Sequence, residues 1–291
     1  MDFCSIGQRG PSARRDSVRH TERKGSRPST TSRQGWYQCA LSLLGVLWLC
    51  MGYACQTVPV TGRQQLILLS ESEESQMGLS AYQQVLREER LSHDPRYNEL
   101  VQRVGQRIAA VANRPDYAWE FRVIDKNIAN AFALPGGKVA VYTGLFPYTR
   151  TEAGLAAVLA HEVAHALARH GGERVSQNML AQIGMSALQI GLRNGDPLVL
   201  QGIALAYGLG VELPFNRSQE SEADHIGLIL MAQAGYDPHE AIGLWQRMEA
   251  GKRGAGPPEF LSTHPSGATR IQQLRQWLPE ALQYYKGPGR S

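Results

Sequence analysis

The sequence predicts an α+β fold that is predominantly helical and contains one small antiparallel sheet. Apolar residues recur at helical spacing in most of the chain beyond residue 72, whereas only two short segments, 119–125 and 138–143, alternate in the manner of strands. The 237 residues that begin at Cys55 contain no internal repeat and suit one domain with a sizeable core. We expect a leader over residues 1–54 followed by a single domain over residues 55–291.

Eight helices are predicted from apolar periodicity bounded by capping residues, glycine or proline. Their ranges are residues 73–90, 95–112, 151–170, 173–192, 198–209, 218–234, 238–250 and 268–278. Linkers rich in glycine and proline are expected at residues 194–197 and 251–258. The aliphatic and glycine-rich stretch 179–213 predicts either core packing or a helical hairpin that covers a cleft or touches lipid.

The sheet is predicted from three features of residues 119–143. Residues 138–143 (Lys-Val-Ala-Val-Tyr-Thr) alternate and are sufficiently β-branched for a strand, and Leu134-Pro-Gly-Gly marks a tight turn before them. Together with residues 119–125, they predict a small antiparallel sheet.

Two histidines stand four residues apart in the helix predicted over residues 151–170. The sequence His161-Glu162-Val-Ala-His165 puts both imidazoles on one helix face, where they can bind a single zinc ion, with Glu162 beside them to polarise a water molecule. The alternative is a chance match. The flanking Ala, Leu and Val residues indicate a buried helix, however, in which these polar side chains need partners. The sequence therefore predicts the site of a zinc hydrolase.

A tetrahedral zinc site needs a third protein ligand in addition to a water molecule. The helix predicted over residues 218–234 offers Glu220 and, one turn later on the same face, Asp224. We assign Glu220 as the third ligand and Asp224 as the acceptor for the N–H of a ligand imidazole. Glu222 is the alternative ligand, and a charged, solvated helix face would explain Glu220 and Glu222 without a metal.

Four separated blocks give the chain a resemblance to a known family. They are residues 130–145, His161 to His165, Glu220-x-x-x-Asp224, and Ser262-Thr-His-Pro-Ser266 followed by Arg270-Ile271. In this order they resemble the gluzincin metallopeptidases that include bacterial HtpX, BepA-like periplasmic proteases, Oma-type mitochondrial proteases and the CAAX prenyl protease. The resemblance implies a zincin-like fold whose small sheet lines the active-site cleft, one zinc ion per chain on His161, His165 and Glu220, and Glu162 as the general base.

The same resemblance implies that an edge strand pairs with the backbone of an extended substrate, which is recognition by strand addition. The residues expected to pair are Ala131, Phe132, Ala133 and Leu134. The alternative for this segment is an ordinary hairpin that packs on the helices.

His264 lies in a predicted loop and is expected to have one of two roles in the site. It either donates a hydrogen bond to the oxyanion formed during hydrolysis, or binds the open fourth position of the metal and holds the enzyme inactive. Both roles come from the resemblance, and the alternative is a capping or core histidine. Another histidine, His170, is expected at a helix end or on the surface. Arg217 is a candidate to hold the carboxylate of Glu220 in position.

The first 54 residues predict export. An Arg- and Ser-rich segment precedes the uncharged apolar run 39–54, which is short for a membrane span and typical of a signal peptide. By resemblance to bacterial lipoprotein signals, Cys55 would be lipidated after cleavage and would anchor the domain on the periplasmic side, with Gln56 favouring the outer membrane. An uncleaved signal anchor is the alternative.

Charge and cysteine content agree with this division. The leader carries +5 of a total net charge of +4, which leaves −1 on residues 55–291, so the basic character of the whole chain does not indicate nucleic-acid binding. The four cysteines are Cys4, Cys39, Cys50 and Cys55, so the exported domain would have no internal disulfide and no thiolate ligand for zinc.

The predicted function is zinc-dependent hydrolysis of peptide bonds, with Glu162 activating the water. By the resemblance, the substrates are misfolded or misassembled proteins of the cell envelope, and the role is proteolytic quality control. The alternative is a non-catalytic periplasmic lipoprotein that binds unfolded chains or an assembly machine and has a structural or regulatory zinc. An intact Glu162 favours the peptidase, because a structural metal needs no base.

Overall fold

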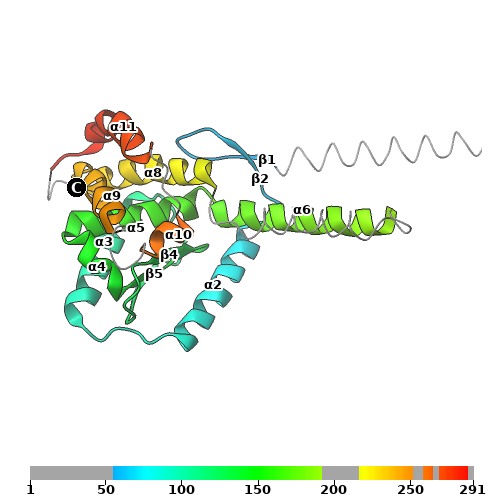
Figure 1. The fold of residues 1–291 in the computed structure, drawn as a ribbon, viewed down its shortest axis with the longest axis horizontal. Coiled ribbons are helices and arrows are strands. Elements are labelled where there is room, and N and C mark those ends of the chain that lie inside the picture. The colour runs from blue at the N-terminus through cyan, green and yellow to red at the C-terminus, as the bar shows by residue number, and fades with distance from the viewer. Residues whose placement is uncertain (1–54, 192–215, 252–257, 265–268, 288–291) are drawn as a thin grey trace, which may run out of the picture. The chain divides into compact units, whose positions relative to one another are not determined.

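The computed structural model describes residues 55–191, 216–251, 258–264 and 269–287 (Figure 1). Its elements are β1 (Cys55–Thr57), β2 (Gln64–Leu66), α2 (Glu71–Glu88), α3 (Pro95–Val111), β3 (Glu120–Ile124), β4 (Ala131–Leu134), β5 (Lys138–Tyr142), the 3-10 turn η1 (Thr143–Leu145), α4 (Phe146–Thr149), α5 (Glu152–Leu167), α6 (His170–Gly191), α8 (Arg217–Gln233), α9 (His239–Gly251), α10 (Phe260–Thr263) and α11 (Arg270–Tyr284). The predicted α+β, predominantly helical fold is confirmed. The leader, the predicted helix 198–209, the linker 194–197 and most of the linker 251–258 lie outside the described residues.

The main sheet has three strands in the order β3-β5-β4, and its strand directions correct the prediction of an antiparallel sheet. β4 and β5 form an antiparallel hairpin, but β3 and β5 are parallel. The reason is that residues 131–134, expected at the edge that pairs with substrate, form a strand between β3 and β5 along the chain, and the prediction of an antiparallel sheet did not count the reversal that this strand adds. With β4 at the edge, the chain reverses twice between β3 and β5, and two reversals restore the original direction.

The two faces of the sheet are covered by different helices. In β5, Val139 and Val141 point into the main core with α3 and α5, whereas Ala140 points to the other face and packs with Tyr82 of α2. This follows from the two-residue period of a strand, and it explains why β5 is apolar on both faces. The hairpin between β4 and β5 turns at Gly136 and Gly137, whose φ angles of 80° and 84° favour glycine.

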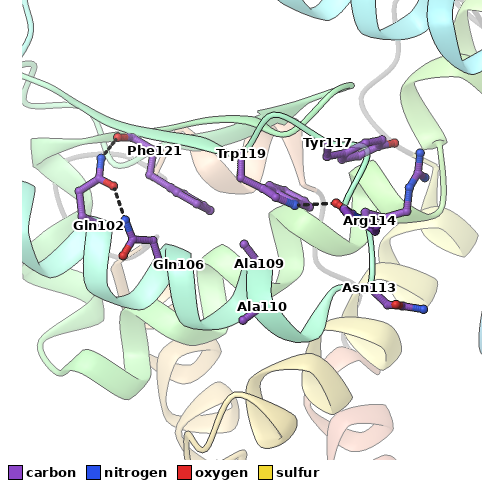
Figure 2. A pocket seen from close by; sticks show the side chains of 10 residues that line it. Gln102, Gln106, Ala109, Ala110, Asn113, Arg114, Tyr117, Trp119 and Phe121 are labelled. Carbon is purple, nitrogen blue, oxygen red and sulfur yellow. Dashed lines mark hydrogen bonds between the residues drawn. The ribbon is translucent and has the colours of Figure 1, made fainter.

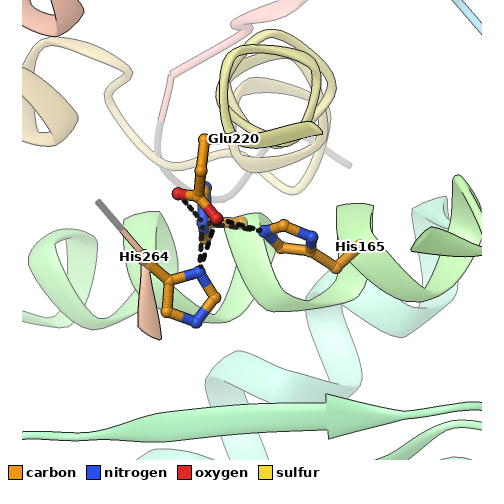
Figure 3. Close-up of side chains that lie close together, drawn as sticks. His165, Glu220 and His264 are labelled. Atoms are coloured by element: carbon orange, nitrogen blue, oxygen red, sulfur yellow. Dashed lines mark hydrogen bonds and ion pairs between the residues drawn. The ribbon is translucent and has the colours of Figure 1, made fainter. Parts of the chain in front are cut away.

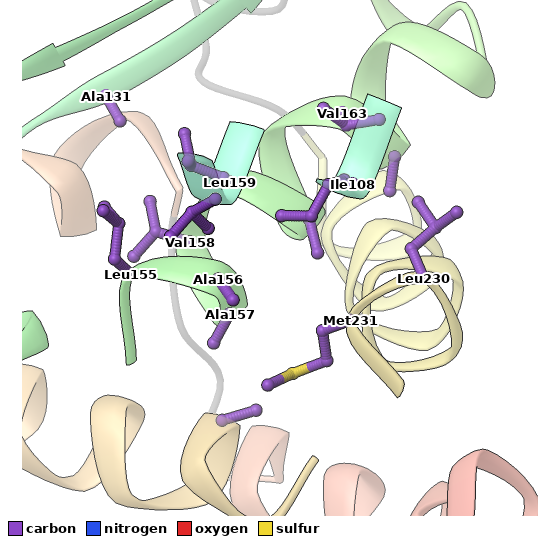
Figure 4. Packing of buried hydrophobic residues seen from close by; sticks show 14 of the residues in the cluster. Ile108, Ala131, Leu155, Ala156, Ala157, Val158, Leu159, Val163, Leu230 and Met231 are labelled. Atoms are coloured by element: carbon purple, nitrogen blue, oxygen red, sulfur yellow. The ribbon is translucent and has the colours of Figure 1, made fainter. Parts of the chain in front are cut away.

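α5 is the central helix of the core, and nearly all of it is buried (Figure 4). It packs against α3 and α8, with Ile108, Val163 and Met231 among the shared apolar side chains. The small alanines of α5 let its neighbours approach closely. α8 approaches α5 closely at Gly227, where an added Cβ would lie 3.0 Å from the Cα of His161.

The boundary between α5 and α6 differs from the predicted helix 151–170. Thr151 caps α5 by accepting a hydrogen bond from the N–H of Gly154 at 2.9 Å, as its sequence position suggests. The helix ends at Leu167, and Arg169 adopts a left-handed φ of 56° before α6 begins at His170. This turn gives His170 a new direction relative to α5.

A short hairpin of β1 and β2, which the sequence interpretation did not predict, precedes α2. Cys55 pairs with Leu66 at its open end. Gln65 donates to the carbonyl of Ala168 at 2.9 Å, and the side chain of Ser176 accepts from the N–H of Leu68 at 2.8 Å. The first bond attaches the hairpin to the α5–α6 turn, and the second attaches the segment after the hairpin to α6. Lipidation of Cys55 stays a prediction, and none of the helices in the described part of the chain has the length and apolar character of a bilayer span.

Candidate metal centre

Four side chains of metal-ligand type converge between α5, α8 and the end of α10. They are His161, His165, Glu220 and His264, all of them buried, and each offers one ligand atom within 4.8 Å of the others. Figure 3 shows His165, Glu220 and His264 pointing toward one another from the three segments. The structure thus brings together the three ligands predicted from sequence and adds His264.

The spacing of these atoms fits a tetrahedral ion. Ligand atoms bound to zinc at about 2.0–2.1 Å on tetrahedral corners lie about 3.3 Å apart. Nε2 of His161 lies 3.1 Å from Nε2 of His165 and 3.3 Å from Nδ1 of His264. Oε1 of Glu220 lies 3.3 Å from Nε2 of His165 and 2.9 Å from Nδ1 of His264. The donor set, three imidazoles and one carboxylate, is one that zinc prefers.

The charges around the centre also fit a cation. Glu162, Glu220 and Asp224 bring three carboxylates into a buried space that contains one guanidinium, Arg270. Burial lowers the pKa of His161, but hydrogen bonds to Asp224 and Glu220 outweigh it and raise the pKa to about 9. Within the described residues, Oε2 of Glu220 and Oε1 of Glu162 accept no hydrogen bond. The residues present therefore fit a zinc ion, which would supply the missing positive charge.

The start of α8 fixes the position of Glu220. Asn216 caps this helix by accepting from the N–H of Gln219 at 2.9 Å, and the side chain of Gln219 accepts in return from the N–H of Asn216 at 3.3 Å. This is a capping box, readable in the sequence as Asn-x-x-Gln. Glu220 thus sits in a rigid first turn, where the helix dipole also favours a carboxylate.

The carboxyl of Glu162 faces both the four-residue cluster, at His264, and the edge strand, at Ala133. Burial raises the pKa of its carboxyl above the ordinary value, while His264 and His161 oppose that rise. The backbone N–H of Ala133 in β4 also faces this carboxylate and favours its charged form. Nε2 of His264 lies 3.4 Å from Oε1 of Glu162. A carboxyl so placed has the pKa direction expected of a base that works near neutral pH.

Asp224 and Arg270 contact the side chains of His161 and Glu220. Oδ1 of Asp224 lies 3.0 Å from Nδ1 of His161, as predicted for an acceptor that fixes the ring tautomer. Arg270 donates to Oδ1 of Asp224 at 2.6 Å and lies 3.2 Å from Oε2 of Glu220, with its guanidinium 3.3 Å from the ring centre of Trp245. The sequence interpretation noted Arg270 only within a family block. Its candidate for steadying Glu220, Arg217, is wrong, because that side chain is exposed and Arg270 fills the role.

His264 reaches the centre from the carboxyl end of α10. Its N–H donates to the carbonyl of Phe260 at 2.8 Å, and its ring stacks on the Phe260 ring with centroids 4.4 Å apart. The N–H of Phe260 in turn donates to the carbonyl of Ala129, just before β4, at 2.9 Å. Sequence spacing could not place His264, because these contacts join segments far apart in the chain.

His170 and Glu222 correct two further expectations. His170, expected at a helix end or on the surface and facing away from the site, does begin a helix, α6, but it is fully buried, with its Nδ1 2.9 Å from Nδ1 of His165. The expectation failed because it treated residues 161–170 as one helix. Glu222, the alternative ligand, lies with Oε2 2.9 Å from Nε2 of His170 and takes no part in the four-residue cluster.

A separate hollow of about 480 Å³ lies between α3 and β3 (Figure 2). Its lining is Gln102, Gln106, Ala109, Ala110, Asn113, Arg114, Pro115, Tyr117, Trp119 and Phe121. The rings of Trp119 and Phe121 stack there with centroids 6.2 Å apart, and the guanidinium of Arg114 covers the ring of Tyr117. None of the four cluster residues lines this hollow, so we assign it no part in the chemistry.

Known proteins resemble this chain over most of its length. A model of Peptidase family M48 matches residues 95–278. The mitochondrial metalloendopeptidase OMA1 of Schizosaccharomyces pombe is 42% identical over 230 residues, which cover 77% of this chain and 66% of that protein. The protein of the same name in Saccharomyces cerevisiae is 30% identical over 304 aligned positions, 97% of this chain and 86% of that protein. The beta-barrel assembly-enhancing protease of Yersinia pestis is 29% identical over 226 residues, 75% of this chain and 46% of that protein.

These matches confirm the family suggested by the four sequence blocks, and they agree with the geometry of the centre. The chain spans 66% of the fission yeast relative and 46% of the Yersinia relative. The family is zinc-dependent, and the cluster of three histidines and Glu220 offers a place for one such ion. The chain therefore belongs to Peptidase family M48 and is a zinc-dependent metallopeptidase.

Proposed function

We propose that this protein is an endopeptidase that cleaves unfolded or misassembled protein chains, with zinc held by His161, His165 and Glu220. The observation that carries the proposal is the convergence of these ligand atoms beside the buried carboxyl of Glu162. A bound zinc ion supplies positive charge that makes a nearby water acidic and polarises the scissile carbonyl. Glu162 accepts the proton of the attacking water and returns it to the leaving amine.

The edge strand β4 provides a place for the substrate backbone. The N–H of Tyr142 donates to the carbonyl of Asn130, so these two residues form a hydrogen-bonded pair of the antiparallel hairpin. In such a hairpin, hydrogen-bonded pairs alternate with pairs that are not bonded to each other. The N–H and C=O groups of Ala131 and Ala133 therefore face away from β5. They face the side on which Glu162 lies. An extended chain that added to this edge would run past the base, and backbone pairing would make cleavage tolerant of sequence.

An apolar hollow at the end of β4 would receive a substrate side chain. It measures about 200 Å³ and is lined by Leu69, Glu74, Met77, Gly78, Ala81, Leu134, Pro135, Gly171, Gly172 and Val175. Leu134 and Pro135 continue directly from the edge strand. A hollow of this composition favours substrates with exposed apolar side chains, which folded proteins hide and unfolded proteins show.

His264 acts as a removable fourth ligand in this proposal. Its Nδ1 lies 3.3 Å from Nε2 of His161 and 2.9 Å from Oε1 of Glu220, where it could hold the metal as a fourth ligand and would then exclude water and substrate, and its Nε2 lies 3.4 Å from Oε1 of Glu162. Of the two roles expected from sequence, this geometry supports the one that holds the enzyme inactive. Displacement of His264 would open the centre.

We also propose that the enzyme is anchored by a lipid at the periplasmic side of a bacterial membrane. The apolar run 39–54 and Cys55 support a lipid anchor on the periplasmic side of a bacterial envelope, with the outer membrane favoured by Gln56. The Yersinia relative is named for enhancing beta-barrel assembly, which supports envelope proteins as substrates and proteolytic quality control as the role.

The test compares wild-type protein with Glu162→Gln for bound zinc and for cleavage of casein, an unfolded protein. We expect one zinc ion per chain in both and cleavage by wild type alone. The rival function is a binding module whose zinc is structural or regulatory. Bound zinc without cleavage by wild type or by His264→Ala, in which the fourth position is open, would favour that rival.

A further inference from the structure

A buried chain of polar side chains runs away from the metal centre, starting at His165. Nε2 of His165 faces the cluster, 3.1 Å from Nε2 of His161, so Nδ1 is its outer nitrogen. That Nδ1 lies 2.9 Å from Nδ1 of His170, and Nε2 of His170 lies 2.9 Å from Oε2 of Glu222. His170 is 0% exposed and Glu222 is 5% exposed. The catalytic proposal gives neither residue a task.

Metal binding by His165 would determine which atom donates in each hydrogen bond of this chain. An imidazole nitrogen binds zinc only without a proton, so a zinc-binding Nε2 places the His165 proton on Nδ1. Nδ1 of His165 then donates to Nδ1 of His170, which must accept. The proton of His170 therefore lies on Nε2, where it donates to the carboxylate of Glu222. One carboxylate thus fixes the tautomers of two imidazoles in series.

The far end of the chain is anchored on the β1–β2 hairpin. Arg63 donates from Nε to Oε2 of Glu222 at 2.8 Å, and its other nitrogens donate to both carboxylate oxygens of Glu173 at 2.8 Å. The hydroxyl of Thr61 also donates to Glu222. Gln219 of the α8 capping box donates to Glu173 at 2.7 Å. The hairpin, α6 and α8 therefore hold one network, and its hairpin part precedes the residues matched by the family model.

We propose that His170 is a positioning residue for the metal, which fixes the tautomer and ring orientation of His165, and that Glu222 and Arg63 hold His170 in place. The inference rests on the assignment of His165 as a ligand in the proposed function. The other ligand histidine offers the comparison, since His161 meets its carboxylate, Asp224, directly at 3.0 Å. His165 receives the same support through an intervening imidazole. Outer partners of this kind strengthen metal binding by about 10- to 100-fold.

The test measures zinc affinity of the full chain by competition with a chromogenic chelator. His170→Phe keeps the volume of the ring but accepts no hydrogen bond from His165, and we expect zinc affinity to fall by about 10- to 100-fold. His170→Asn keeps an acceptor oxygen near the position of Nδ1 and should recover part of the affinity. Glu222→Gln is isosteric and should lower the affinity by a smaller factor.

Glu74→Gln is the matched control. Glu74 is buried and pairs with Arg169 at the same α5–α6 turn, 2.5 Å from its guanidinium, yet it makes no contact in the His170 chain. This variant should lower the unfolding temperature of the metal-free protein while leaving zinc affinity within about twofold of wild type, since it weakens the turn without touching His165.

The control separates positioning from simple stabilisation of the turn. Wild-type zinc affinity in His170→Phe, or an equal loss in Glu74→Gln, would overturn the inference. If His170→Phe does not fold, wild-type affinity in Glu222→Gln together with no loss in Arg63→Met would overturn it. A wild-type protein that binds zinc but does not cleave casein would count against the proposed function alone, because zinc affinity is independent of turnover.

Discussion

Nδ1 of His264 lies 2.9 Å from Oε1 of Glu220, so two residues separated by 44 positions in the chain offer adjacent ligand atoms to the metal centre. This contact closes the centre on the side that faces Glu162. The position of His264 therefore depends on α10, which is tied to the segment just before the edge strand by the hydrogen bond from the N–H of Phe260 to the carbonyl of Ala129.

Replacement of His264 by Ala should raise the basal rate of casein cleavage and weaken zinc binding. The rate rises because the fourth corner becomes available to water and substrate, and the affinity falls because one ligand is lost. Thr263→Ala changes the neighbouring residue of α10 and should leave the rate unchanged. A large loss of cleavage in His264→Ala, with zinc still bound, would instead assign His264 to stabilisation of the oxyanion.

Replacement of Arg270 by Met should destabilise the metal-free protein more than the zinc-bound protein. Removal of the guanidinium leaves Asp224 and Glu220 buried without their counter-charge, at a cost of about 3–5 kcal/mol in the metal-free state. Bound zinc restores positive charge and should reduce that cost. Urea unfolding with and without a chelator measures the difference.

Arg247→Met serves as the control for this experiment. Arg247 donates to the carbonyl of Tyr148 at 2.7 Å and to Glu240 at 2.6 Å, away from the metal centre. Its loss should lower stability by the same amount in both metal states. An equal loss in both states for Arg270→Met as well would contradict a link between Arg270 and the metal.

Replacement of Gly227 by Ala should destabilise the fold and lower zinc affinity together. The added Cβ would lie 3.0 Å from the backbone of His161, which cannot move without shifting α5 against α8. Overpacking of this kind costs about 1–3 kcal/mol, and the shift would separate Glu220 from the histidines. Gly184→Ala, at a position of α6 with nothing within 4 Å, should leave stability unchanged or raise it. Equal zinc affinities of Gly227→Ala and wild type would refute the coupling.

Acid should remove a stabilising contribution from Glu222. Burial opposes its charge, but hydrogen bonds from His170, Thr61 and Arg63 outweigh burial and lower its pKa to about 2. An unfolded glutamate has a pKa of about 4.3, so the stabilisation is complete above that pH and is lost as the pH falls toward 2. The difference in unfolding free energy between wild type and Glu222→Gln should shrink across this window. A difference independent of pH would contradict the assignment.

Local patterns in the sequence predicted the elements that hold the chemistry. The i, i+4 spacing of His161 and His165 depends only on residues within one or two helical turns. The same is true of Asp224, one turn after Glu220. The structure brings His161, His165 and Glu220 together and puts Asp224 beside His161, and their roles as ligands and acceptor stay predictions.

The sequence interpretation was wrong where a local change in the backbone altered the direction of the following helix or strand. The left-handed Arg169 ended α5 and turned His170 into the interior, although a helical projection of residues 161–170 placed it on the opposite face. The strand at residues 131–134 added a reversal that made β3 and β5 parallel. In both cases one residue or one short strand is hard to recognise in the sequence but changes the direction of the chain that follows it.

The sequence by itself determined that His161 and His165 share one face of a helix and that Glu220 and Asp224 share one face of another, because residues four apart lie on the same side of a helix. Only the tertiary structure decided the rest of the centre: the arrival of His264 from α10, the counter-charge of Arg270 from α11, and the path from His165 through His170 to the β1–β2 hairpin. The physical reason is that these contacts join segments brought together by packing around α5, and such long-range packing leaves no periodic mark in the chain.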